Sequence, residues 1–208
     1  MLLIDHSIKD FARLLSSDTP APGGGSTAAL EGALGISLTH MVGSLTVGRE
    51  KYAQHAEFLA NLLKEAKTLQ EQFLAVIDED TQTYNKVTAV FAMPKATDAE
   101  KASRKEAMQA ALKDCTKPPL TMMELSLKAL ELTLAAVDKT NTNASSDLAV
   151  ASLSLKAAVQ GAWLNVLTNI SGINDTAFVA EYRTKGEAII ETALPMADTV
   201  YDTILKRF

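Results

Sequence analysis

Cysteine, histidine and aromatic residues are all scarce in this chain, and each scarcity excludes a kind of protein. The one cysteine, Cys115, excludes a disulfide framework and a zinc site built on thiolates. The three histidines, His6, His40 and His55, are scattered along the chain, so we expect no bound metal. Aromatic residues make up only 5% of the chain while alanine is abundant, which favours closely packed helices.

Positive charge is also in short supply. Lys and Arg total 20 against 25 Asp and Glu, and no basic run could track a phosphate backbone, so we expect no nucleic-acid partner. The first residues, MLLIDHSIKDF, lack the charged-then-apolar order of a signal peptide. The default expectation is a cytoplasmic protein.

No segment alternates polar and apolar residues with the period of a strand. Apolar residues recur instead every three or four positions, which predicts helices. We therefore expect an all-α protein: one domain, residues 1–208, folded as an antiparallel bundle of about seven helices, one of them very long. The expected helices span residues 8–15, 27–46, 52–91, 97–117, 120–137, 145–171 and 176–208. Capping residues Ser7, Thr97 and Ser145 or Ser146 mark three starts, and Pro118-Pro119 marks one end.

The segment 27–46 is almost as long and apolar as a membrane span. However, Glu31 and His40 interrupt it, and no aromatic or basic anchors flank it. Small residues recur four apart along it, which lets another backbone approach closely. We therefore expect no membrane insertion, and a helix that is buried or lies at a dimer interface.

The segment from Pro20 to Ser26 holds two prolines and three consecutive glycines, which predicts a loop. Its free backbone N–H groups and the positive end of the following helix dipole form a plausible cradle for a carboxylate, a phosphate or a polar heterocycle. The alternative is a sharp turn between two helices. No Gly-Lys-Ser/Thr follows, so it is not a Walker loop.

A carboxylate interrupts the apolar stripe of the longest helix. The stripe through Phe73 and Val76 continues into Asp80 and then Tyr84, so Asp80 falls on the buried face. Burial raises the pKa of a carboxyl group, which suits a proton donor or acceptor near neutral pH. The alternative is a buried ion pair with a Lys or Arg of another helix. Asp78 lies about 200° further round the helix, so the two acids cannot face one site equally.

A second polar interruption carries amides. Asn165 and Asn169 extend the inward stripe of the helix 145–171 and could offer donors and acceptors to a ligand, or simply join two helices by hydrogen bonds. The other candidate site residues can also be explained by a purely structural role. Asp147 could complement a helix dipole, Asp175 could cap the last helix, and Arg49, Lys51 and Lys95 could be solvated surface rather than partners of an anionic substrate. Cys115 has no neighbouring histidine pattern, which argues against a nucleophile.

Taken in order, these segments resemble one family. The resemblance rests on Pro22-Gly23-Gly24-Gly25-Ser26, Met41-Val42-Gly43, Leu45-Thr46-Val47-Gly48-Arg49, Asp78-Glu79-Asp80 with Tyr84, Pro94-Lys95, Ser146-Asp147, Gly161-Ala162 with Asn165 and Asn169, and Ile173-Asn174-Asp175. Each motif is weak, but the ordered set runs nearly end to end. It resembles the cyclodeaminase domain of formiminotransferase-cyclodeaminase and its stand-alone relatives, which include methenyltetrahydrofolate cyclohydrolases.

The resemblance implies a helical homodimer that acts on a tetrahydrofolate carrying a one-carbon unit and needs no cofactor. Its reaction would be cyclodeamination of 5-formiminotetrahydrofolate to 5,10-methenyltetrahydrofolate; the alternatives are hydrolysis of the methenyl form to 10-formyltetrahydrofolate, or a noncatalytic helical dimer. We expect Asp80 as the acid–base group, assisted by Asp147 or Asp175 from another helix or subunit. The expected substrate-binding residues are Gly23, Gly24, Gly25, Ser26, Arg49, Asp78, Tyr84, Lys95, Asn165 and Asn169.

Overall fold

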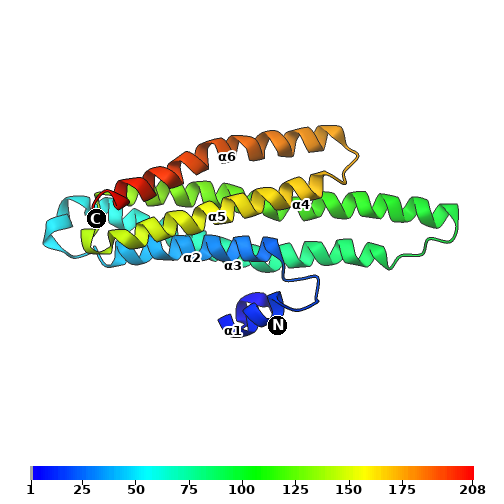
Figure 1. Ribbon diagram of the computed structural model, residues 1–208, viewed down its shortest axis with the longest axis horizontal. Helices are drawn as coiled ribbons and strands as arrows, with labels where there is room; N and C mark the ends of the chain where they lie inside the picture. The colour runs from blue at the N-terminus through cyan, green and yellow to red at the C-terminus, as the bar shows by residue number, and fades with distance from the viewer. Residues whose placement is uncertain (1) are drawn as a thin grey trace.

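The computed structural model describes residues 2–208, and within them it contains helices and no strands (Figure 1). The six α-helices are α1 (Ile8–Leu15), α2 (Gly24–Ser44), α3 (Ala56–Phe91), α4 (Asp98–Ala136), α5 (Ser145–Ile170) and α6 (Thr176–Leu205). Short 3-10 turns are η1 (Leu3–Asp5), η2 (Glu50–His55) and η3 (Thr142–Ala144). The all-α prediction is confirmed, with one α-helix fewer than expected.

Helices α2 to α6 form one elongated bundle in which α2 and α5 run antiparallel in close contact (Figure 1). The contact depends on glycine residues, which have no side chain. A Cβ on Gly35 would approach Leu155 Cγ at 2.7 Å, and one on Gly161 would lie 3.1 Å from the Cβ of Ala28. Small residues therefore bring these backbones together, as the composition predicts. No helix among residues 2–208 has the length and hydropathy needed to cross a membrane.

The expected break at Pro118-Pro119 is wrong: α4 continues through both prolines. Proline has no N–H, so Pro119 leaves the carbonyl of Cys115, four residues earlier, without its helical donor. Asn169 of α5 replaces that donor, since its Nδ2 donates to the Cys115 carbonyl at 2.8 Å. Two expected helices are therefore one helix of 39 residues.

Two caps are confirmed. Ser7 Oγ accepts from the backbone N–H of Asp10 at 3.1 Å at the start of α1, and Thr97 with Glu100 forms a capping box at the start of α4. The glycine segment ends earlier than expected, because Gly24, Gly25 and Ser26 form the first turn of α2. Helix α1 lies beside the bundle (Figure 1), and the adjoining η1 is joined to α3 where the N–H of Leu3 donates to Asp78 at 2.6 Å.

Candidate active site

The first turn of α2 meets α3, α4 and α5 around a cavity of about 180 Å³. Each element contributes to its wall, and the loop before α2 closes one side. The lining residues are Pro20, Ala21, Gly23, Gly24, Gly25, Asp80, Thr81, Tyr84, Cys115, Asn165, Thr168 and Asn169. The structure thus brings together three glycines, the carboxylate, the tyrosine and both amides that the sequence singles out.

Asp80 is the acidic side chain of this wall. Ser26 Oγ donates to its Oδ2 over a long 3.4 Å and also lies 3.1 Å from Thr81 Oγ1. Burial raises the pKa of the Asp80 carboxyl to about 6, against the opposing effect of its hydrogen bonds from Ser26. No Lys or Arg within residues 2–208 forms an ion pair with it, so the alternative of a buried ion pair is not what the structure shows. The carboxyl therefore titrates within reach of neutral pH while facing a cavity.

Gly25 has a specific steric reason to be glycine. A Cβ at this position would collide with the carboxylate of Asp80. The missing side chain therefore lets the carboxylate lie directly against the first turn of α2. Ser26 is completely buried and holds Asp80 rather than lining the cavity itself.

The two asparagines use their amide nitrogens within the protein. Asn165 Nδ2 donates to the carbonyl of Gly161, and Asn169 Nδ2 donates to that of Cys115, both at 2.8 Å. The interhelical reading therefore holds for Asn169. Both residues also line the cavity, so their side chains can meet a ligand there.

Three lining residues were not singled out as binding residues from the sequence: Thr81, Cys115 and Thr168. Thr81 is adjacent to Asp80, and Thr168 lies about one turn after Asn165. These spacings are the only indication in the sequence that the two threonines line the cavity. Burial, reinforced by the charge of Asp80, raises the pKa of the Cys115 thiol. A thiol held in its protonated form is a poor nucleophile, in keeping with the reading from sequence.

The remaining predicted residues lie away from the cavity. Asp147 is about 27 Å along α5 from Asn165, and Arg49 follows the far end of α2. Lys95 lies beyond the end of α3, and Asp78 binds the N–H of Leu3. Asp175 caps α6 by accepting from the N–H of Phe178 at 3.1 Å, and Lys113 at 2.7 Å lowers the pKa of its carboxyl. For Asp175 the structure shows the capping arrangement; its catalytic role stays a prediction.

Fold and cavity together define a class: an all-helical protein with a small polar site built around one carboxyl group of raised pKa. Comparison with known proteins identifies the family. The family model Formiminotransferase-cyclodeaminase matches residues 7–188, so the chain belongs to this family.

This chain matches relatives of similar length and also longer relatives, of which it covers only a part. A Methylorubrum extorquens protein named methenyltetrahydrofolate cyclohydrolase is 34% identical over 96% of both chains. The rat formimidoyltransferase-cyclodeaminase is 29% identical over 99% of this chain, which spans only 38% of that longer protein. A Thermotoga maritima crystal structure titled formiminotetrahydrofolate cyclodeaminase superposes with a TM-score of 0.82 at 22% identity, covering 97% of this chain and 98% of that one. It confirms the fold.

Proposed function

We propose that this protein converts 5-formiminotetrahydrofolate to 5,10-methenyltetrahydrofolate and ammonia. The observation that carries the proposal is Asp80, a carboxyl group with a pKa of about 6 on the wall of a polar cavity. Such a group is populated in both protonation states near neutral pH, so it can both accept and donate protons. Membership of the family is the argument for a folate substrate, and the cavity contains the acid–base group.

The reaction has two proton movements that Asp80 can serve. N10 of the folate attacks the formimino carbon, a C–N bond forms, and the N10 proton is transferred to the former imino nitrogen. The C–N bond to this amino group then breaks, and the leaving nitrogen takes a further proton to depart as ammonia. The protonated carboxyl of Asp80 donates that proton. The step needs no electron transfer, and the proposal invokes no cofactor.

A second candidate reaction is favoured by the Methylorubrum extorquens relative, which matches this chain from end to end and is named a methenyltetrahydrofolate cyclohydrolase. In that reaction water adds to the methenyl carbon, the C–N5 bond breaks, and one proton is released to give 10-formyltetrahydrofolate. Here the ionised carboxylate of Asp80 would remove a proton from the attacking water. The same side chain serves both reactions, so the choice between them needs a measurement.

We also propose that residues 1–208 act as one domain within a homodimer. Most residues of helix α2 are small or apolar, a pattern typical of a buried helix. Its exposed face nevertheless carries Leu34 and Met41, with Leu45 directly after the helix, and the exposed face of α5 carries Val150, Leu153 and Leu164. A second copy related by a two-fold axis through the middle of these faces would cover them. It would also bring the end of the partner that carries Arg49 and Asp147 to the level of the cavity.

The reaction is tested by giving the purified protein 5-formiminotetrahydrofolate and 5,10-methenyltetrahydrofolate separately. Appearance of methenyl absorbance together with ammonia from the first substrate supports the cyclodeaminase. Enzyme-dependent loss of methenyl absorbance from the second supports the cyclohydrolase. No change with either substrate contradicts both and supports a noncatalytic helical module.

The dimer is tested separately by sedimentation of the wild-type chain and of the variant Leu34→Glu with Leu164→Glu. We expect a dimer for the first and a monomer with retained helicity for the second. A wild-type monomer would contradict the dimer.

A further inference from the structure

The side-chain amides of Asn165 and Asn169 are each held in one orientation. Asn165 Nδ2 donates to the carbonyl of Gly161, and Asn169 Nδ2 donates to the carbonyl of Cys115, each at 2.8 Å. Reversing either amide would place its oxygen against a carbonyl oxygen, where no hydrogen bond can form. Each amide nitrogen is therefore directed at the protein, and each Oδ1 lies on the opposite side of its amide.

Both amide oxygens are free to accept a hydrogen bond at the cavity. Within residues 2–208 the hydrogen bonds of these two side chains are made by the nitrogens alone. In the same part of the chain, the buried polar side-chain atom that lacks a partner is Oδ2 of Asp78, so neither amide oxygen is sealed inside the protein. Asn165 and Asn169 are half-buried and line the cavity, so they offer two acceptors to a ligand.

The two asparagines lie close to Asp80. A Cβ on Gly24 would be 3.7 Å from Asn165 Nδ2, and a Cβ on the following glycine would meet the Asp80 carboxylate. Asn169 bonds the carbonyl of Cys115, whose thiol has a pKa raised by burial and by the nearby charge of Asp80. Three side chains that carry acceptor oxygens thus surround one cavity of about 180 Å³.

The cavity carries negative charge without a cationic side chain. Asp80 is its acidic lining residue, and no Lys, Arg or His of residues 2–208 lines it. Ser26 already hydrogen-bonds to Asp80 through its backbone and its hydroxyl, and Thr168 donates its hydroxyl to the carbonyl of Leu164 at 2.8 Å. The wall formed by α5 therefore presents acceptors beside a carboxylate, which favours a cationic ligand that bears N–H groups.

The one-carbon units that a folate carries differ in their ability to donate hydrogen bonds. The formimino group is an amidine, which is protonated near neutral pH and then bears N–H groups on its terminal nitrogen. The formyl group has a carbonyl oxygen at that position, and the methenyl carbon bears only C–H. Of these three units, the formimino group is the one that matches a cavity wall of acceptors.

We propose that the amide oxygens of Asn165 and Asn169 accept hydrogen bonds from the protonated terminal nitrogen of a 5-formimino group. The inference rests on the proposed function and specifies how its site selects the substrate. The two asparagines determine specificity for nitrogen over oxygen in the one-carbon unit, and they hold the nitrogen that leaves as ammonia close to Asp80. A formyl oxygen at the same place would face two acceptor oxygens and leave both without a donor.

The test compares 5-formiminotetrahydrofolate with 5-formyltetrahydrofolate, in which oxygen replaces the terminal nitrogen. The measured quantity is the formimino preference, defined as Ki of the formyl compound, acting as a competitive inhibitor, divided by KM of the formimino substrate. We expect a preference well above one for the wild type. In Asn165→Leu, which keeps a similar shape but has no acceptor, the preference should fall about tenfold, the effect of one hydrogen bond to a charged group.

Two further variants separate the acceptor from the rest of the side chain. Asn165→Asp keeps an acceptor oxygen and should retain the preference that Asn165→Leu loses. Asn61→Leu removes an amide from an exposed position of α3 outside the cavity and should keep the wild-type preference. Circular dichroism checks the fold of each variant, which should be intact because the bond from Asn165 Nδ2 lies within α5.

Asn169 is tested by Asn169→Leu. This substitution should lower the preference, and it should also lower the unfolding temperature, because the carbonyl of Cys115 loses its donor from α5. A lower unfolding temperature with an unchanged preference would contradict a role of Asn169 in specificity.

A wild-type preference of about one would overturn the assignment of the asparagines while leaving the reaction in place. An unchanged preference in Asn165→Leu would overturn it as well. So would an equal loss in Asn165→Asp and Asn165→Leu, since an acceptor would then make no difference.

Failure of the proposed reaction has a different signature, because the formimino compound would not be turned over. Calorimetric titration of the wild type and of Asn165→Leu with both compounds then gives the dissociation constants directly. Tighter binding of the formimino compound by the wild type, lost in Asn165→Leu, supports the assignment. Equal binding of the two compounds, or no binding of the formimino compound, overturns it.

Discussion

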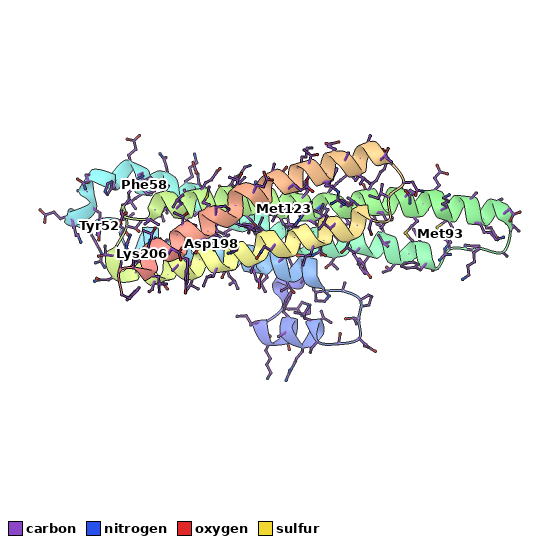
Figure 2. The ribbon with its side chains drawn as sticks, turned by 45° about the horizontal axis from the view of Figure 1, so that its top comes forward. Tyr52, Phe58, Met93, Met123, Asp198 and Lys206 are labelled. Carbon is purple, nitrogen blue, oxygen red and sulfur yellow. The ribbon has the colours of Figure 1, made fainter. Side chains whose placement is uncertain are left out.

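Polar groups are buried at both ends of α2, but their hydrogen bonding differs between the two ends. At the far end, where Figure 2 labels Tyr52, the N–H of Asn141 donates to Thr46 Oγ1 at 2.9 Å and the N–H of Thr142 donates to Tyr52 Oη at 3.1 Å. At the cavity end, the Asp80 carboxylate receives a long side-chain bond from Ser26 and faces open space. Short, complete hydrogen bonds indicate a structural role, whereas a poorly solvated carboxyl beside a cavity indicates a chemical one.

The largest expected effect is at the cavity end. Asp80→Asn keeps the shape of the side chain but removes its proton chemistry, so turnover should fall by about 100-fold or more with helicity intact. Turnover assays and circular dichroism check this. Glu79→Gln changes the exposed neighbouring carboxylate and should keep wild-type turnover. Near-normal turnover of Asp80→Asn would contradict the assignment.

Glycine-to-alanine substitutions at the two ends should separate activity from stability. In Gly25→Ala the new methyl group displaces the Asp80 carboxylate, and turnover should fall about tenfold or more. In Gly43→Ala the methyl meets Leu62 Cδ2 at 2.5 Å instead, which should cost about 1–3 kcal/mol of stability while folded molecules keep their turnover. Equal turnover losses in the two variants would remove the distinction between the two ends.

The pH dependence of stability should also depend on Asp80. Its pKa is about 6 in the folded protein against 3.8 ordinarily, so the folded state holds this proton more tightly. The resulting stability is fully present below about pH 4 and is lost as the pH rises through about 6, by at most about 3 kcal/mol. Denaturant unfolding from pH 4 to 8 should show wild type losing stability relative to Asp80→Asn over this range. A relative gain would contradict the raised pKa.

The smallest effect is expected at the far end. Tyr52→Phe removes the acceptor of the Thr142 N–H and should cost about 1 kcal/mol in urea unfolding, with unchanged turnover. A large loss of turnover in this variant would show that the far end takes part in the chemistry.

The parts of the fold that were predictable are those set by local sequence. The starts of α1 and α4 follow from the caps at Ser7 and Thr97, because each cap is completed within three residues. The continuity of α4 was not predictable, because the donor that compensates for Pro119 comes from Asn169, 50 residues further along the chain.

The same distinction applies to the site. Asp80 is visible in the sequence because it breaks an apolar stripe, and the structure places it in the cavity. The lengths of the helices determine where Arg49, Asp147 and Lys95 lie. These residues belong to the same ordered set of motifs as the glycine segment, but within one chain they lie far from it. Conversely, Thr168 and Cys115 line the cavity only because two helix faces happen to meet there.

The central claim is that one cavity carboxyl, Asp80, exchanges protons near neutral pH. The most direct measurement is a ¹³C NMR titration of the aspartate side-chain carboxyls, with the Asp80 signal assigned by its loss in Asp80→Asn. The account predicts a titration midpoint of about 6 for that signal and a matching inflection in the pH profile of kcat/KM. A midpoint near the ordinary aspartate value of about 4 would contradict it.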